Sequence, residues 1–231
     1  MAPKYVALMA SLPPIGPSFE SGQTPISRLR LESRLRMLDE RDAATLHAIT
    51  GVITWADQPV DRTDPDFVAA TGALLAELRQ PVLRRIVSHR LDQRTVVVAL
   101  RRRHRGETSP PTGTPWGWGQ WVNTIERRWG DPLFGLGGVL PWLAQAKDLL
   151  EADDAVGLER LQFNLTWRML DTLAAGHGFD FVAVVVYLMR WSMVARWSCY
   201  RADAAEARFA ALVEKALQSF TPSPHADVVW S

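Results

Sequence analysis

The chain has 231 residues, 47% of them apolar and 22% charged, as is usual for a globular protein of one large domain or two closely joined ones. Its net charge of +1 excludes a polycationic chain that binds nucleic acid through its overall charge. A single cysteine, Cys199, excludes an intrachain disulfide and a multi-cysteine metal site, and it fits a reducing compartment.

No segment predicts export or insertion into a membrane. Residues 1–14 lack the long apolar core of a signal peptide. The most apolar stretch, residues 179–197, is interrupted by Asp180, Arg190 and Arg196, so it predicts a buried helix instead of a membrane span. We therefore expect a soluble, cytoplasmic protein with no integral membrane span.

Proline marks the predicted helix starts in the N-terminal half. Residues 5–12 are apolar and fit either a short strand or the first turns of a helix. Thr24-Pro25, Asp64-Pro65 and Pro81 then each begin a helix, because proline suits the first helical turn. The third helix runs to Arg105. Its Val-rich segment could also form a strand, but flanks rich in Arg and Leu favour a helix.

The C-terminal half follows a linker rich in Pro and Gly at residues 106–118. Helices are predicted at 139–152, 155–175, 180–200 and 202–219. The last has the clearest apolar face, formed by Phe209, Leu212, Val213, Ala216, Leu217 and Phe220. The sequence thus predicts an all-α multi-helix bundle with an N-terminal lobe at 1–105, a C-terminal lobe at 119–221 and a flexible tail at 222–231.

No catalytic or cofactor-binding constellation stands out in the sequence. There is no glycine-rich phosphate loop, no Gly-x-Ser-x-Gly turn and no His or Cys pair at metal-ligand spacing. His177 lies between two glycines and could be a base or a ligand, although a loop residue between helices is the favoured interpretation. We expect no enzymatic activity, cofactor or metal. A deep polar pocket around His177 would instead indicate an enzyme with a dispersed site.

Arginines are concentrated in residues 79–105, where nine of them accompany a single acid, Asp92. On a helical wheel, four share one stripe: Arg90, Arg94, Arg101 and Arg105. This stripe continues an apolar one, while Arg102 and Arg103 point elsewhere and are expected to face water. Its partners could be acids within the chain, an acidic protein surface or a phosphate backbone, and internal pairing is the favoured interpretation.

Three tryptophans, Trp116, Trp118 and Trp121, gather on a glycine-containing loop. They fit the core of a helical domain, an anchor for a partner protein or a stacking platform for single-stranded nucleic acid, in decreasing order of preference. Together with the arginine stripe they form the candidate partner-binding surface. The near-neutral net charge makes nucleic acid the less favoured partner.

Three segments together resemble proteins of rotary ATPases. They are Tyr5-Val-Ala-Leu-Met-Ala-Ser-Leu-Pro13, Asp92-Gln-Arg-Thr-Val-Val-Val-Ala-Leu-Arg101 and Phe179-Asp-Phe-Val-Ala-Val-Val-Val-Tyr187-Leu-Met-Arg190. The first resembles the start of a bacterial family associated with V/A-type ATPase operons. The second and third are similar to helices that this family shares with the helical stalk subunit of archaeal and vacuolar ATPases.

This resemblance implies helical lobes like those of the stalk subunit, and a non-enzymatic subunit or accessory protein of a bacterial V/A-type rotary ATPase. Such a protein is a stalk or adaptor that contacts other subunits on the cytoplasmic side, peripheral to the inner membrane. The alternative, from the residues alone, is a helical nucleic-acid-associated protein that uses the Arg-rich helix and the Trp-rich loop.

Overall fold

The computed structural model describes residues 4–20, 22–53 and 62–219, with side chains throughout except at 201–212 and 214–219. Within these ranges the chain is helical and forms no strand, which confirms the predicted all-α multi-helix bundle. Its elements are α1 (Val6–Ala10), α2 (Arg28–Leu35), α3 (Glu40–Ile53), α4 (Asp64–Glu77), α5 (Pro81–His104), α6 (Val122–Arg127), the 3-10 helix η1 (Pro132–Gly135), α7 (Trp142–Glu151), α8 (Ala155–Leu173) and α9 (Phe181–Ser219).

Helices α4 and α5 begin where the sequence predicts, and side-chain caps explain why. Thr63 Oγ1 accepts a hydrogen bond from the backbone N–H of Asp66 at 3.3 Å, and Pro65 occupies the first turn of α4. At α5 the Gln80 side chain accepts from the N–H of Leu83 at 3.2 Å. Each cap supplies an acceptor to N–H groups that a helix start leaves without an intrahelical partner.

The first helices differ from the prediction in their boundaries. Residues 6–10 form the short helix α1, and α2 begins at Arg28 instead of Thr24. A break then separates α2 from α3. Asp39 explains this break, because its carboxylate accepts from the N–H of Asp42 at 2.7 Å and so caps a new helix.

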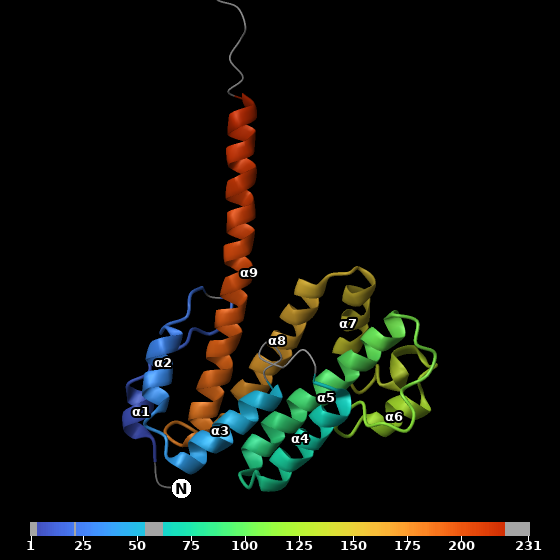
Figure 1. Ribbon diagram of the computed structural model, residues 1–231, viewed down its shortest axis with the longest axis horizontal. Coiled ribbons are helices and arrows are strands. Elements are labelled where there is room, and N and C mark those ends of the chain that lie inside the picture. Colours follow the sequence, from blue (N-terminus) through green and yellow to red (C-terminus); the bar gives the residue numbers. More distant parts are fainter. Residues whose placement is uncertain (1–3, 21, 54–61, 220–231) are drawn as a thin grey trace, which may run out of the picture.

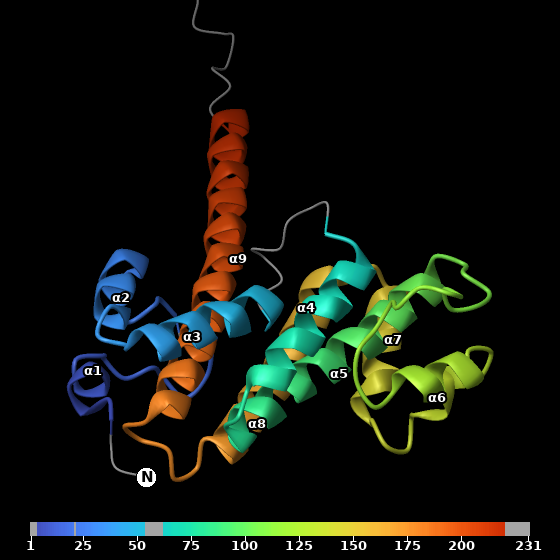
Figure 2. The ribbon, with the colours of Figure 1, turned by 60° about the horizontal axis from the view of Figure 1, so that its bottom comes forward.

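One hydrophobic core lies where α1 to α5 meet α8 and the first half of α9 (Figures 1 and 2). Phe19, from the loop between α1 and α2, inserts its ring edge-on against Phe163 and Trp197, with both pairs of ring centroids 5.3 Å apart. The interior of this core contains residues from five helices that are no more than 1% exposed: Leu8, Ile49, Ile86, Leu170 and Val185.

The N-terminal segment runs along one side of α9 and is fixed to it by hydrogen bonds. Trp191 Nε1 donates to the carbonyl of Ile26 at 2.8 Å, and Ser198 Oγ donates to the carbonyl of Gly22 at 2.7 Å. Trp191 and Ser198 are seven residues apart, so they share one face of α9. Residues 22–26 therefore cover that face near the middle of the helix.

A second hydrophobic core is enclosed by α6, η1, α7 and the loop around Trp116, at the opposite end of the molecule from α1 (Figure 2). It is built from residues 96–158, whereas the first core takes residues from both sides of this range. This division differs from the predicted lobes at 1–105 and 119–221. The reason is that α5 and α8 are long enough to contribute to both cores.

The apolar stretch at residues 179–197 forms the first half of α9 and lies in the first core. Its valines and methionines are buried around most of the helix: Val182, Val184, Val185, Val186, Met189, Met193 and Val194. Burial on several sides is what an all-round apolar helix requires in water. No helix in the described parts of the chain combines the length and the apolarity needed to cross a bilayer.

Helix α9 is one continuous helix of 39 residues, where the sequence predicted two at 180–200 and 202–219. Residues 199–203 contain neither Pro nor Gly, so no residue interrupts the helix at the predicted break. Its second half, residues 201–219, extends away from the folded body in both views (Figures 1 and 2). We call it the distal segment. Phe220 and the predicted tail at 222–231 lie outside the described residues.

Candidate docking surfaces

Arg90, the first arginine of the predicted stripe, lies in the interior and is only 6% exposed. Its Nη1 donates to Thr166 Oγ1 of α8 at 2.8 Å and to Gln93 Oε1 at 3.1 Å. Burial lowers the pKa of Arg90 to about 10, because the protein interior solvates a cation less well than water does. This side chain therefore connects α5 to α8 inside the fold.

Arg94 lies one turn further along α5 and is half-buried against α4. Its guanidinium carbon is 3.5 Å from the centroid of the Phe67 ring, a cation–π contact, and Nη2 is 4.0 Å from Asp64 Oδ1. Arg102, which was expected to face water, binds the same carboxylate, with Nη2 2.7 Å from Asp64 Oδ2. Asp64 thus holds the start of α4 to α5 through two arginines.

The last two arginines of the stripe, Arg101 and Arg105, are exposed. Arg105 Nη2 lies 3.4 Å from Glu107 Oε1, in the loop that follows α5. The four arginines therefore share one side of α5, but they do not form one surface. Neighbouring helices cover Arg90 and Arg94, while Arg101 and Arg105 reach solvent.

The Trp-rich loop packs into the fold. Trp116 is 2% exposed, and its Nε1 donates to Glu126 Oε1 at 2.9 Å. Its ring meets Trp129 edge-on, with centroids 6.3 Å apart, inside the second core. Trp118 and Trp121 are half-buried and pack against the first and second core, respectively. Of the three interpretations of these residues, the core best describes how they are placed.

Two polar side chains of α5 fasten this loop. Thr95 Oγ1 donates to the carbonyl of Trp118 at 2.7 Å and accepts from its N–H at 2.9 Å. Asp92 accepts from the backbone N–H of Gln120 at 3.1 Å and from its side-chain amide at 3.0 Å. The aromatic loop is therefore held in place by α5 and serves as the lid of the second core.

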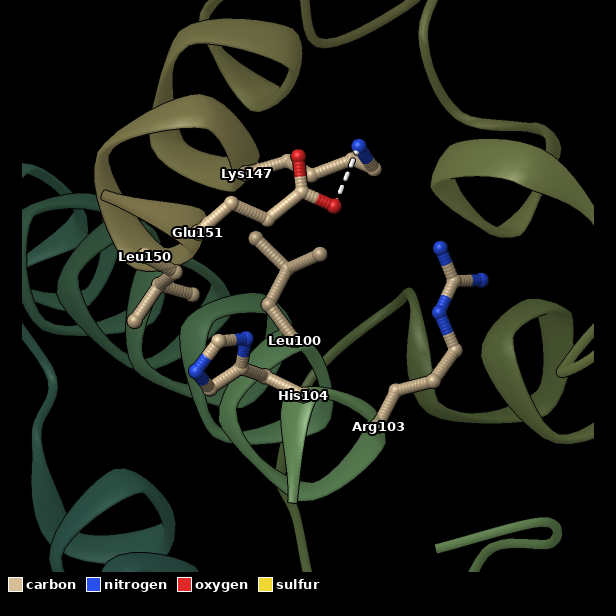
Figure 3. Close-up of a pocket in the computed structure, with 6 residues that line it drawn as sticks. All are labelled: Leu100, Arg103, His104, Lys147, Leu150 and Glu151. Carbon is tan, nitrogen blue, oxygen red and sulfur yellow. Dashed lines mark ion pairs between the residues drawn. The ribbon is translucent and has the colours of Figure 1, made fainter. Parts of the chain in front are cut away.

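A small hollow of about 100 Å³ lies between α5 and α7 (Figure 3). It brings together Arg103, His104 and Lys147, and Lys147 Nζ lies 2.6 Å from Glu151 Oε1 (Figure 3). Arg103 Nη1 donates to the carbonyls of Trp129 and Asp131, so much of its charge is already engaged. The volume suits a few water molecules and is below the range of ordinary ligand pockets.

A wider hollow of about 480 Å³ surrounds His177, between the N-terminal segment, the end of α8 and the start of α9. His177 Nδ1 meets the Asp180 carboxylate, and Arg190 pairs with Asp171. A His–Asp pair can orient a base, but the described residues that line this hollow include no Ser, Thr, Cys or Lys, and the hydroxyl of Tyr187 is engaged by the carbonyl of Pro13, to which it donates at 2.9 Å. The Arg190–Asp171 pair joins α9 to α8, and the Tyr187 hydrogen bond joins α9 to the N-terminal segment.

Metal-binding groups are likewise not gathered in the described residues, among which no three of His, Cys, Asp or Glu meet as a metal site would require.

The distal segment of α9 carries an apolar sequence pattern beyond the folded body. Ala202, Ala205, Phe209, Leu212 and Ala216 follow one another at intervals of three and four residues, the spacing of paired helices. Val213, whose side chain is described, is 42% exposed. The face predicted from the sequence shares Phe209, Leu212 and Ala216 with this set and was expected on a separate last helix, whereas these residues belong to the helix that begins in the first core.

Comparisons of the chain with protein-family models, with curated proteins and with solved structures found no match.

Proposed function

We propose that the protein is a non-enzymatic helical adaptor, a stalk-like subunit or accessory protein of a bacterial V/A-type rotary ATPase, that acts through protein contacts on the cytoplasmic side. The build of α9 carries this proposal. One half of the helix is part of the first core and the other half extends from the body. At the usual rise per residue its 39 residues span about 58 Å, of which the distal segment is about 28 Å.

A helix anchored in this way suits an adaptor. The anchored half ties the direction of the distal segment to the folded body, so a partner bound at the far end is held at a set distance from it. The rotary ATPase is named as the complex because of the three segments that resemble its subunits. Two of them, Asp92–Arg101 and Phe179–Arg190, belong to α5 and to the start of α9, which organise the fold.

Co-purification from the native host tests this proposal. The tagged full chain should enrich subunits of the rotary ATPase from the detergent-solubilised membrane fraction. A chain ending at Tyr200 keeps the side chains of both cores and should lose this enrichment, while a matched chain ending at Ser219 should keep it. Absence of ATPase subunits from the full-chain sample, with the protein folded by circular dichroism, would reject the rotary-ATPase assignment.

A further inference from the structure

The basic positions of the distal segment form one row. Arg201, Arg208 and Lys215 recur every seven residues, which places them along one side of the helix, next to the apolar positions. On the other side of the apolar face only one acid, Glu206, flanks the seam, while Asp203 and Glu214 lie toward the back of the helix. A helix that binds another helix has such a pattern, because charges beside the apolar seam select the partner.

The apolar positions indicate which shapes fit opposite them. Of the six heptad positions in residues 201–219, three are alanines, at 202, 205 and 216, and the others are Phe209, Leu212 and Ser219. In a parallel pair of identical segments, alanine would meet alanine in three of these six layers and serine would meet serine in a fourth. A face with larger side chains opposite the alanines fills the seam better, so the sizes favour a partner with a different sequence.

A second copy of this chain fits the distal segment poorly for two further reasons. In an antiparallel pair the basic rows would face each other. In a parallel pair the bodies would meet at the base of the segment. There, residues 22–26 already cover α9 at Trp191 and Ser198. These two residues lie on the same face as Ala205 and Leu212, at intervals of seven, so the face is occupied where a second copy would continue.

We propose that the distal segment binds an amphipathic helix of another protein that carries a row of acidic residues beside its apolar face. This inference rests on the proposed function, since it takes α9 as the docking element, and it adds the chemistry of the partner. The acidic row faces Arg201, Arg208 and Lys215. Three exposed ion pairs of ordinary strength together change affinity by about tenfold.

Two synthetic peptides test this proposal with the full chain. Both have about four heptads with Ile and Leu in the apolar positions, and the flanking positions are all Glu in one and all Lys in the other. Like charges keep each peptide from pairing with itself. The Glu peptide should bind about tenfold more tightly than the Lys peptide in fluorescence anisotropy at low salt, and high salt should narrow the difference.

Charge reversal at the basic row provides the decisive variant. The triple variant Arg201→Glu, Arg208→Glu and Lys215→Glu should reverse the preference between the two peptides. A matched control changes three exposed arginines of α2 and α3, Arg30→Glu, Arg34→Glu and Arg41→Glu, and should keep the wild-type preference despite the same change in net charge. Equal binding of both peptides, no binding of either, or an unchanged preference in the first variant would overturn the inference.

Sedimentation equilibrium examines the second copy as the alternative occupant. Concentration-dependent dimers of the full chain, together with a monomeric chain ending at Tyr200, would also overturn the inference. Failure of the proposed function looks different. A clear preference for the Glu peptide without ATPase subunits in the co-purification would retain the acidic helix and remove the named complex. Equal recovery of ATPase subunits by the wild type and the charge-reversed variant would retain the rotary ATPase as the complex and remove the acidic helix as the partner.

Discussion

Arg90 is a cation inside a helical bundle, and the oxygens around it decide what its burial costs. Thr166 Oγ1 accepts from its Nη1 at 2.8 Å and Gln93 Oε1 accepts at 3.1 Å. The Thr166 hydroxyl in turn donates to the carbonyl of Gln162, one turn earlier in α8, at 2.8 Å. Because an interior charge must be solvated by protein groups, each of these acceptors stabilises the folded state.

The variant Thr166→Val tests this role. Valine keeps the shape of threonine but removes the oxygen that Arg90 uses, so the free energy of unfolding should fall by about 1 to 3 kcal/mol in urea denaturation. Thr172→Val is the matched control in the same helix, since its hydroxyl is exposed and donates to the carbonyl of Arg168 at 3.1 Å. The control should change stability by less than about 0.5 kcal/mol. Equal effects at both positions would contradict the role given to Thr166.

The burial of Tyr187 leads us to predict that the folded protein loses stability in alkaline solution. Its hydroxyl donates to the carbonyl of Pro13 at 2.9 Å, and burial raises its pKa from 10.0 to about 12. The folded state therefore holds this proton more tightly than the unfolded chain does. Its contribution to stability is complete below pH 10.0 and is lost as the pH rises toward about 12.

Urea denaturation across this pH range checks the prediction. Tyr187→Phe should be less stable by about 1 kcal/mol at neutral pH, because it lacks the hydrogen bond, and should lose less stability than the wild type at alkaline pH. The absorbance of tyrosinate in the folded wild type should also rise at higher pH than in the unfolded chain. Coincident absorbance curves would show that burial does not perturb the tyrosines.

The arginines of α5 show that a helical wheel gives the side of the helix on which a residue lies but not how deeply its side chain is buried. The wheel placed four arginines on one side of α5, and the continuous helix agrees with that placement. It could not give depth, because depth depends on α4 and α8, which cross α5 at Arg94 and Arg90. The same limit applies to Arg102, whose partner Asp64 lies 38 positions earlier in the chain.

Among the elements, the loop that contains Trp116 is the best place to separate packing from docking. Trp116→Ala should lower the free energy of unfolding by about 3 to 5 kcal/mol, because it empties a site in the second core. Trp121→Ala, at a half-buried position of the same loop, should cost less than half as much. Urea denaturation followed by circular dichroism measures both. A stable Trp116→Ala variant would favour the loop as a partner anchor.

Helix starts were more predictable from sequence than helix ends. Proline with a capping residue marks the start of α4 and α5 in both sequence and structure, because those signals act locally. The separation of α2 from α3 depends on the Asp39 carboxylate, which caps α3. No proline accompanies Asp39 to mark this helix start in the sequence. Helix α9 is continuous because no proline or glycine lies near residue 200. The absence of a helix-breaking residue is a weaker sequence signal than its presence.

For the whole molecule, composition and periodicity were enough to predict the all-α class, but not to predict how the chain is divided between the two hydrophobic cores. The proline-rich linker at 106–118 suggested two consecutive lobes, yet it closes over a core that α5 also supplies. The wider hollow around His177 brings together residues 9–15, 171–178 and 183–190, which no local pattern joins. Long-range packing of this kind is set by the tertiary structure and leaves no periodic signal in the sequence.

Because α9 is continuous, the number of residues between its anchored half and the distal segment determines how the distal segment is rotated about the helix axis relative to the folded body. One alanine inserted between Tyr200 and Arg201 should turn the distal segment by about 100° about the helix axis, whereas seven should bring it back to within about 20° while moving it outward by about 10 Å. Binding of the Glu peptide should survive both insertions, because the basic row stays intact. Recovery of a native partner that also touches the body should fall with one added residue and partly return with seven, which co-purification can measure.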